Sequence, residues 1–359
     1  MSKAADLASL ASASETALSN RNIVINGAMQ ISQRATSATG KTSAGYFAVD
    51  RNYVTLEDSG TWTITQTADG PSGFANCLRY DCTTADATVA VAARMMSSMR
   101  LEGQDLQQLK KGTSDAEYFT ISFWVKSNKT GNYVLGVYDH DTSGGRQVAK
   151  LYTINSADTW EYKSITYPPD TSGPLSDDNG LSLQLQFYLA AGTNWTSGTR
   201  QEAWAAVTAA NRAAGQAVQL SDSTDNDWSI TGVQMEIGSQ ATPFEHRSFG
   251  EELALSSRYY TDSVRANDKT AHLVGYVQVA TVARFGFHVP MRASPTIVET
   301  NFNILHGGGS EQAITSIDDI SQDNQFLSFR ANVAANLTSG QAVALHSDGA
   351  ATLTFDAEL

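Results

Sequence analysis

The sequence predicts an all-β protein built around an antiparallel β-sandwich, and three observations support this. From about residue 22 to residue 238, apolar and polar residues alternate with a period of two. Turns rich in Gly, Asn and Asp separate the alternating runs. Charged residues make up only 17% of the chain, and Ser and Thr fill the polar positions instead. Many short strands with one apolar face are typical of sandwiches.

The clearest strand is 119–126 (FTISFWVK). Its alternation places Phe119, Ile121, Phe123 and Val125 on an inward face and leaves a polar outer face. Similar runs predict strands at 62–67, 133–138, 148–154, 160–167, 181–189 and 228–237. Between the last two, the Ala-rich segment 202–214 predicts a short helix within a long excursion.

The first 21 residues differ from the rest and predict a short N-terminal helix. Ala4, Leu7, Ala11 and Leu18 follow the 3,4 spacing of a coiled-coil seam, which Ser14 interrupts. We expect an attachment or oligomer-contact helix. The alternative is an amphipathic helix that docks on its own domain.

A second boundary falls near residue 250 and divides the chain into a sandwich (22–249), a linking helix (250–265) and a smaller β domain (266–359). Glu251 and Glu252 occupy the first turn of the linking helix, where the helix dipole favours acids. The alternation then returns and predicts strands at 271–282, 285–289, 296–304, 325–332 and 341–355.

The charge balance restricts the partners. With 24 Lys and Arg against 37 Asp and Glu, the formal net charge is −13, which disfavours nucleic acid and anionic membrane surfaces. No run reaches the roughly 18 apolar residues of a membrane-spanning helix, and the N-terminus is too polar for a signal peptide. We therefore expect synthesis in a cytoplasm and no insertion into a membrane. Cys77 and Cys82 are expected to be free thiols, and the alternative is a bridge across a tight hairpin.

The sequence contains no motif for catalysis or for a cofactor. Nucleophile elbows, phosphate-binding loops and zinc signatures are absent, and no acid pair has a glycosidase context. We expect no enzyme activity, no cofactor and no resident metal. Calcium remains an alternative to solvated turns at the acidic clusters 139–141, 177–179 and 222–227.

Sugar binding requires exposed aromatic rings beside polar groups. Trp195 and Trp204 are the best candidates because they flank a Gly- and Thr-rich excursion, and Tyr138 is the third. The alternative is that these rings pack the excursion against the sandwich or a neighbouring subunit.

Several motifs, in order from residue 26 to residue 296, resemble those of a family of phage tail-fibre and appendage proteins. They are NGAMQISQR (26–34), Asp50-Arg51, SFWVKS (122–127), ITGVQMEIG (230–238), ATPFEHRS (241–248), RYY (258–260) and PMRASPT (290–296). Two positions depart from the family pattern. Asn52 stands where Trp is usual, and Ser256-Ser257 replace Cys-Gln.

The resemblance implies a jelly-roll sandwich similar to carbohydrate-binding modules, then a helix and a terminal β domain. It implies a homotrimer carried on the virion and assembled in the host cytoplasm. The N-terminal segment would attach to other tail or virion proteins. No catalytic residue carries over, because the shared motifs are architectural.

The motif residues suit that architectural role. We expect Asp50 and Arg51 to pair at a strand end, and Phe244 to cover the sandwich edge. Gln234 and Glu236 alternate with apolar residues on one strand, and Glu245, His246 and Arg247 would pair locally or across subunits.

The expected function is therefore that of a non-catalytic tail fibre or spike component that adsorbs to a host surface glycan or receptor. Loops 301–310 and 335–340 are receptor candidates. The alternatives are a capsid-attached fibre or decoration protein, a stand-alone lectin and a depolymerase. The low charge would then reflect sandwich faces buried against symmetry mates.

Overall fold

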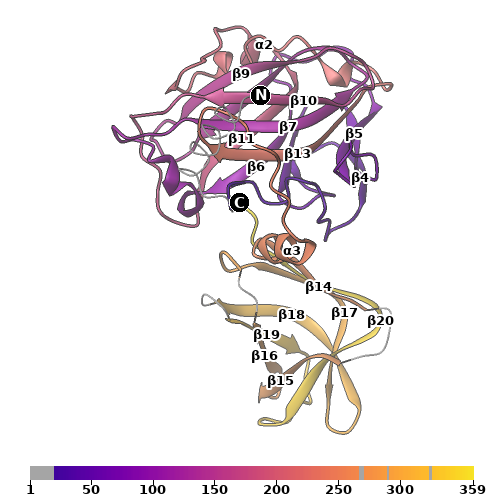
Figure 1. Cartoon of the computed structure of the whole chain (residues 1–359). Coiled ribbons are helices and arrows are strands. Elements are labelled where there is room, and N and C mark those ends of the chain that lie inside the picture. The colour runs from indigo at the N-terminus through magenta and orange to yellow at the C-terminus, as the bar shows by residue number, and fades with distance from the viewer. Residues whose placement is uncertain (1–19, 267–270, 289–290, 323–325) are drawn as a thin grey trace. The chain divides into compact units, whose positions relative to one another are not determined.

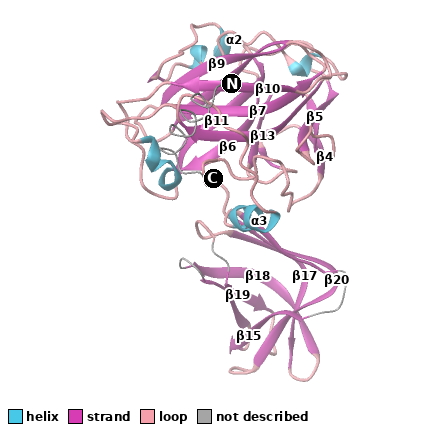
Figure 2. Ribbon diagram, viewed as in Figure 1, coloured by secondary structure: helices cyan, strands magenta, loops and turns pink. Residues whose placement is uncertain are grey.

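The chain forms two compact β units, described separately below. The computed structural model describes residues 20–266, 271–288, 291–322 and 326–359 (Figure 1). Unit 1 is Met1–Glu252 with Leu359, and unit 2 is Leu253–Glu358. Residues 1–19 of the predicted N-terminal helix lie outside the described residues. Antiparallel sheets dominate both units, which confirms the all-β prediction (Figure 2).

Unit 1 is a sandwich of two antiparallel sheets. One has the strand order β1-β4-β5-β13-β7-β10, and the other has the order β12-β9-β8-β11-β6-β3-β2. The first sheet contains β1 (Ser37–Lys41), β4 (Thr61–Thr67), β5 (Cys77–Thr84), β7 (Phe119–Ser127), β10 (Glu161–Tyr167) and β13 (Asp227–Ile237). The second contains β2 (Gly45–Tyr46), β3 (Asn52–Glu57), β6 (Arg94–Glu102), β8 (Gly131–Asp139), β9 (Arg146–Ile154), β11 (Leu181–Ala191) and β12 (Ala205–Ala206).

The strand pairing is that of a jelly roll. The hairpin β8–β9 is the centre of a long antiparallel ribbon, because β7 pairs with β10, β6 with β11 and β5 with β13. Rolling this ribbon up places β5, β7, β10 and β13 in one sheet and the other four strands in the second. The alternating apolar positions of both sheets then face one another.

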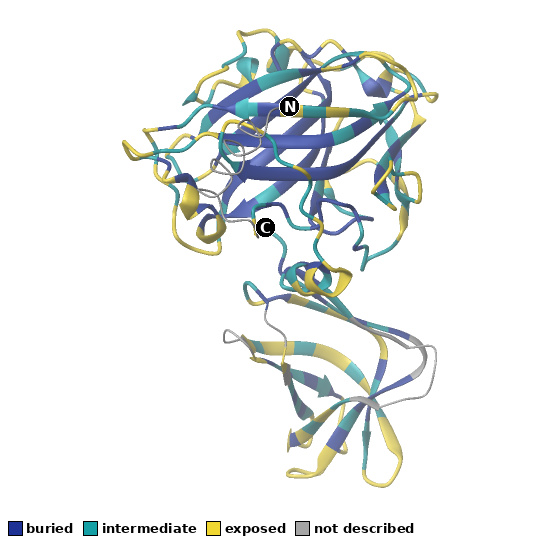
Figure 3. Ribbon diagram, viewed as in Figure 1, coloured by how far each residue is buried: buried dark blue, intermediate teal, exposed yellow. Residues whose placement is uncertain are grey.

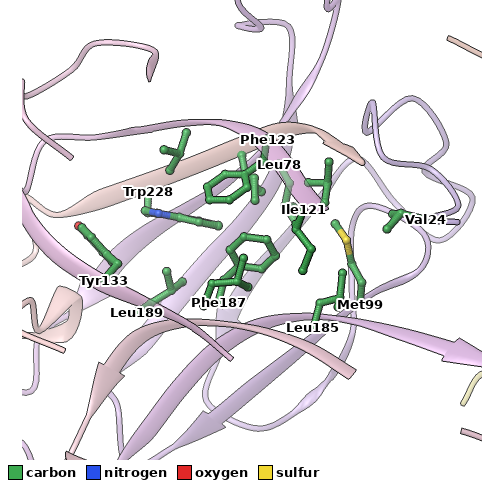
Figure 4. Packing of buried hydrophobic residues seen from close by; sticks show 14 of the residues in the cluster. Val24, Leu78, Met99, Ile121, Phe123, Tyr133, Leu185, Phe187, Leu189 and Trp228 are labelled. Atoms are coloured by element: carbon green, nitrogen blue, oxygen red, sulfur yellow. The ribbon is translucent and has the colours of Figure 1, made fainter. Parts of the chain in front are cut away.

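The core of unit 1 fills the space between the sheets. Phe123, Phe187 and Trp228 pack in its centre, with ring centroids 5.1 Å apart for the first pair and 6.1 Å for Phe187 and Trp228 (Figure 4). Phe123 and Trp228 come from the six-stranded sheet, and Phe187 comes from the seven-stranded sheet. The rings therefore join the two layers, as the alternation predicts.

The central strands β11 and β13 are covered on both faces (Figure 3). The excursion after β11 packs Ala213 and Trp195 against the outer side of the seven-stranded sheet. Beside β13, Ile23 donates its amide to the Met235 carbonyl at 2.9 Å, and Val233 donates to the Gly27 carbonyl at 2.9 Å. The outer face of the sandwich is consequently open only in part.

Two details differ from the sequence expectations. The polar face of β7 is not solvent-lined near its start, because Thr120 is fully buried and bonds the Thr166 hydroxyl and the Gly238 carbonyl, each at 2.9 Å. Segment 202–214 is not a regular helix. It contains the two-residue strand β12 and one 3₁₀ turn, η2 (Ala209–Asn211), because Trp204 packs inward and holds the chain extended there.

The β9–β10 turn supplies a prediction on acid stability. Burial raises the pKa of Glu161, but bonds from Lys163 Nζ (2.6 Å), Ser156 N (2.8 Å) and Asn155 lower it to about 2. This stability is present above a pH of about 4.5 and is lost as pH falls towards 2. Glu161→Gln should reduce the free energy of unfolding at pH 7 by about 1–2 kcal/mol and flatten its decline between those pH values. Urea titrations at several pH values measure both effects.

The control for that experiment is Glu117→Gln. Glu117 is an exposed carboxylate that pairs with Lys110 Nζ at 2.7 Å. An exposed pair contributes at most about 1 kcal/mol. If Glu161→Gln had no larger effect than Glu117→Gln at pH 7, the turn network would not stabilise the sandwich.

Unit 2 is a small closed barrel. The helix α3 (Phe249–Ser257) leads into it from unit 1, and its strands are β14 (Tyr260–Ala266), β15 (Ala271–Val279), β16 (Val282–His288), β17 (Thr296–His306), β18 (Ser310–Gln322), β19 (Phe326–Val333) and β20 (Ala342–Asp356). The order is β14-β20-β15-β16-β19-β18-β17, and β17 also pairs with β20, which closes the ring. Its core includes Phe285, Phe329 and Phe355.

Three expectations for this region need correction. The linking helix ends at Ser257 rather than 265, because residues from Tyr260 onward pair with β20. The proposed loop 301–310 is mainly strand, and only Gly307–Gly309 turns the chain between β17 and β18. Strand β18 (Ser310–Gln322) was not predicted.

Two further findings concern the helices and the cysteines. None of the helices described is long and apolar enough to cross a membrane. Cys77 and Cys82 are buried free thiols on the same strand, β5.

Candidate functional site

A strip of polar and aromatic side chains lies on the outer face of the seven-stranded sheet. Gln184 and Gln186 project from β11, with Gln184 opposite Arg100 of β6 on one side and opposite Tyr138 of β8 on the other. His140 follows β8 directly. We call these residues, together with Arg212 and Trp195 of the excursion, the polar strip.

Hydrogen bonds fix the amides of the polar strip. Gln186 Nε2 donates to Gln184 Oε1 at 3.1 Å, and His140 Nε2 lies 3.2 Å from the same oxygen. Gln186 Oε1 in turn accepts from the Tyr188 hydroxyl at 3.2 Å and from Arg212 Nη2 at 3.0 Å. Because each amide is oriented by its neighbours, the strip is preorganised rather than adaptable.

Two aromatic rings meet at the Arg212 guanidinium. Its carbon Cζ lies 4.6 Å from the centroid of Tyr138 and 5.5 Å from that of Trp195. The Tyr138 ring also contacts the His140 ring, with centroids 4.5 Å apart. Tyr138, Trp195 and Arg212 are each half-buried and His140 is exposed, so part of this cluster faces solvent.

The charges around the polar strip shift the pKa of His140. Although the residue is exposed overall, its ring packs on Tyr138, and this partial burial lowers the pKa of the imidazole. The bond to Gln184 and the charge of Asp139 oppose that effect, whereas the positive charges of Arg100 and Arg212 lower the pKa further. The net shift is downward, so the ring is neutral at pH 7. The positive charges of Arg100 and Arg212 therefore both affect the His140 imidazole.

The other predicted sugar-binding residue, Trp204, lies elsewhere. Its ring packs against the core of unit 1, and its indole nitrogen donates to the Pro168 carbonyl at 3.0 Å. The Lys111 ammonium lies 4.8 Å from the ring centroid. Trp204 is thus a packing residue, which was the alternative considered for it.

A buried ion network surrounds Lys111. Its Nζ lies 2.5 Å from Asp139 Oδ2 and 3.1 Å from Asp170 Oδ2, and it donates to the Gly173 carbonyl at 2.6 Å. Arg146 binds both oxygens of Asp170, at 2.7 and 2.8 Å. Burial raises the pKa of Asp170, but the bonds from Arg146 and Lys111 outweigh it and hold the pKa below its usual value.

In the first acidic cluster considered for calcium, residues 139–141, the carboxylates bind other residues of the protein. Asp139 turns inward to the Lys111 ammonium, and Asp141 Oδ2 accepts the Ser176 amide at 2.8 Å. In the cluster near residue 222, Asp222 contacts the Lys129 ammonium and the Asn226 amide. Among the described residues, no group of three or more His, Cys, Asp or Glu is arranged to hold a metal ion.

The first motif forms a buried hub at Asn26. The Asn26 amide nitrogen Nδ2 donates to the carbonyls of Ile31 (2.8 Å) and Asp50 (2.9 Å), and its Oδ1 accepts the Ile31 amide at 2.9 Å. The Asp50 carboxylate accepts Gln33 Nε2 at 2.7 Å, and Arg51 donates to the Arg100 carbonyl at 2.7 Å. Asp50 and Arg51 thus anchor different segments, the motif and β6.

The 241–248 motif is held by side chains of β13. Gln234 Oε1 accepts the Glu245 amide at 2.8 Å, and Glu236 binds the amide and hydroxyl of Thr242 at 2.8 and 2.6 Å. Glu245 Oε2 accepts the amide of Asn22 at 2.8 Å. These contacts lie within unit 1 and clamp the segment over the strand.

The same motif is tied to α3 and to an aromatic cluster. Arg247 donates to the Val24 carbonyl at 3.1 Å and lies 3.3 Å from Glu252. The rings of Phe244 and His246 pack on Phe74, with centroids 5.0 and 5.1 Å away. Phe244 is half-buried there.

Sequence reasoning named Tyr138 and Trp195, which the structure brings together, but it named neither the amides nor the arginine between them. The run 181–188 (LSLQLQFY) did carry a signal, because Ser182, Gln184 and Gln186 alternate with Leu. Large amides on one face of a strand suggest a hydrogen-bonding surface rather than a solvated one. Arg212 had no local signal, since only the excursion brings it to the strip.

Comparisons with known proteins give weak structural likenesses. No family model matches the chain, and no curated protein matches its sequence. Solved structures to which it is similar include three with 12% identity. The first is the enzymatically active domain of tailspike protein 4 of bacteriophage CBA120, with a TM-score of 0.31 over 60% of this chain and 21% of that chain. The second is the family 11 carbohydrate-binding module of a Clostridium thermocellum cellulosomal cellulase, with a TM-score of 0.28 over 61% of this chain and 96% of that chain. The third is the CBM22-1–GH10 modules of C. thermocellum endo-1,4-β-D-xylanase 10B, with a TM-score of 0.30 over 58% of this chain and 30% of that chain.

Proposed function

We propose that unit 1 binds a carbohydrate on its polar strip, and that the chain is a non-catalytic adsorption component of a phage virion. One observation carries the binding proposal: Tyr138 and Trp195 meet at Arg212 beside the bonded amides Gln184 and Gln186. Aromatic faces take the apolar face of a pyranose, and a guanidinium takes its hydroxyls. Gln184 and Gln186 are 6% and 3% exposed, so they support Arg212 from beneath. The virion role rests on the motif resemblance.

The proposal includes self-association and attachment. A homotrimer would bury polar, charge-poor faces of the sandwich, and the N-terminal segment would attach it to a tail or other virion protein. Host contact would also involve loop 335–340 of unit 2. Native mass spectrometry at micromolar concentration tests the trimer directly, and a monomer would contradict it.

Glycan-array binding by Tyr138→Ala tests the site. Loss of the ring should weaken binding of an array hit at least about tenfold. Tyr162→Ala is the matched control, because Tyr162 is 46% exposed and lies on β10 of the other sheet. Unchanged binding by Tyr138→Ala, or loss with Tyr162→Ala, would place the site elsewhere. Release of reducing ends from a bound polysaccharide would contradict the non-catalytic role.

A further inference from the structure

The arginines of the polar strip, Arg100 and Arg212, differ in their pairing from Arg94 beside them and from several other described arginines. Arg94 of β6 stacks on Trp195, with its Cζ 4.2 Å from the ring centroid, and it pairs with Glu57 at 2.7 Å. Arg212 has no carboxylate within 4.0 Å among the described residues. Arginines elsewhere do have such partners: Arg79, Arg146, Arg200, Arg247, Arg284 and Arg330.

The donors of Arg212 are also underused. A guanidinium carries five N–H groups. Nη2 bonds Gln186, and Nε is buried, so the donors left for a ligand are those of Nη1, which bond no described residue. The nearby carboxylates cannot supply a partner, because Asp139 is turned to Lys111 and Asp141 bonds Ser176. Arg212 is thus held in place by two rings and one amide while its charge stays uncompensated.

A second arginine for which the described residues supply no Asp or Glu partner lies along the same strip. Arg100 stacks on Tyr53, with Cζ 3.4 Å from the ring centroid, and donates to the main-chain oxygen of Leu359. Its Nε, like that of Arg212, is buried without a partner. Both positive charges contribute to the lowered pKa of His140, after burial of its ring. In a chain of net charge −13, this is a local excess of positive charge.

We propose that the polar strip selects an anionic glycan, with Arg212 as the residue that binds the acidic group of the sugar. This rests on the proposed function of the strip and adds its ligand class. The fork of a guanidinium matches carboxylate, sulfate and phosphate oxygens alike, so the shared requirement is an acidic group on the sugar. Tyr138 and Trp195 contact the Arg212 guanidinium and hold it at the strip, where it would meet the acidic group.

The test uses the full chain on an array that pairs each acidic glycan with its neutral counterpart. Uronic acids are paired with their carboxyl-reduced forms, and sulfated or phosphorylated sugars with their unsubstituted forms. We expect hits confined to acidic members, and the arms of the array identify which acidic group is bound. For a hit, affinity should fall at least tenfold between 50 and 500 mM NaCl, since screening weakens charge pairing.

Two variants assign the effect to Arg212. Arg212→Gln should weaken binding of the acidic hit at least tenfold. Arg212→Lys retains the charge but not the fork, so its affinity should lie between those of the unmodified protein and of Arg212→Gln. Arg200→Gln is the control, since Arg200 belongs to the same excursion but pairs with Glu202. Equal, salt-independent binding of neutral and acidic forms that Tyr138→Ala still abolishes would overturn the inference and leave the proposed function standing. Binding to no glycan would overturn both.

Discussion

Lys111→Met should lower the free energy of unfolding of unit 1 by about 3–5 kcal/mol. The side chain of Lys111 is 3% exposed and that of Asp139 is fully buried. Removal of the ammonium leaves Asp139 without its cation and Asp170 with Arg146 alone. An uncompensated buried carboxylate is far more costly than a missing pair at the surface. Urea denaturation followed by tryptophan fluorescence measures the loss.

The neighbouring residue provides the control. Lys110 pairs with Glu117 at 2.7 Å, but the two side chains are 52% and 40% exposed. Lys110→Met should therefore change stability by about 0.5 kcal/mol or less. Adding Asp139→Asn to Lys111→Met should restore part of the loss, because it removes the stranded charge. Equal effects of the two lysine substitutions would refute the role of the network.

Asn26→Ala should destabilise unit 1 by about 3–5 kcal/mol, because it removes three buried hydrogen bonds and leaves their backbone partners unsatisfied. Asn26 is 1% exposed and adopts a left-handed φ of 59°. Asn26→Gly separates the two contributions, since glycine accepts this φ but makes no side-chain bond. If the bonds dominate, the glycine variant should lose nearly as much stability as the alanine variant.

An exposed asparagine controls for the backbone conformation. Asn20 has a φ of 57° and is exposed to solvent. Asn20→Ala should cost about 1 kcal/mol or less, because only the conformational preference is lost. If chemical denaturation gave similar losses for Asn20→Ala and Asn26→Ala, the motif around Asn26 would not organise the sandwich.

The sequence predicted the strands that follow a strict period of two, and it failed where bulges break that period. In β18, Ile314, Ile317 and Ile320 recur every three residues, yet all three pack against the barrel core. Pairing with β19 shifts register between Ile314 and Ser316 and again between Asp318 and Ser321. Each extra residue changes which face the next side chain takes, so alternation alone could not reveal this strand.

Only part of the candidate site could be predicted from the sequence. Tyr138 was identified through its own strand, and Trp195 through the composition of its segment. Trp204 has the same surroundings in sequence as Trp195 but packs inward, and no local pattern separates the two. Arg212 reaches the strip only through the path of the excursion over the sheet, which is a tertiary property.

The position of β13 has a consequence for the order of events during synthesis. This strand, Asp227–Ile237, lies between β5 and β7, and β7, the nearer of the two in sequence, ends 100 residues before it. Until the ribosome has released it, β4–β5 and β7–β10 are separate pairs, each with an open edge facing the place where β13 will insert. Open edges on a nascent chain invite pairing with other chains. The sandwich therefore closes late, by insertion of one central strand, and its folding rate should be set by that long-range step.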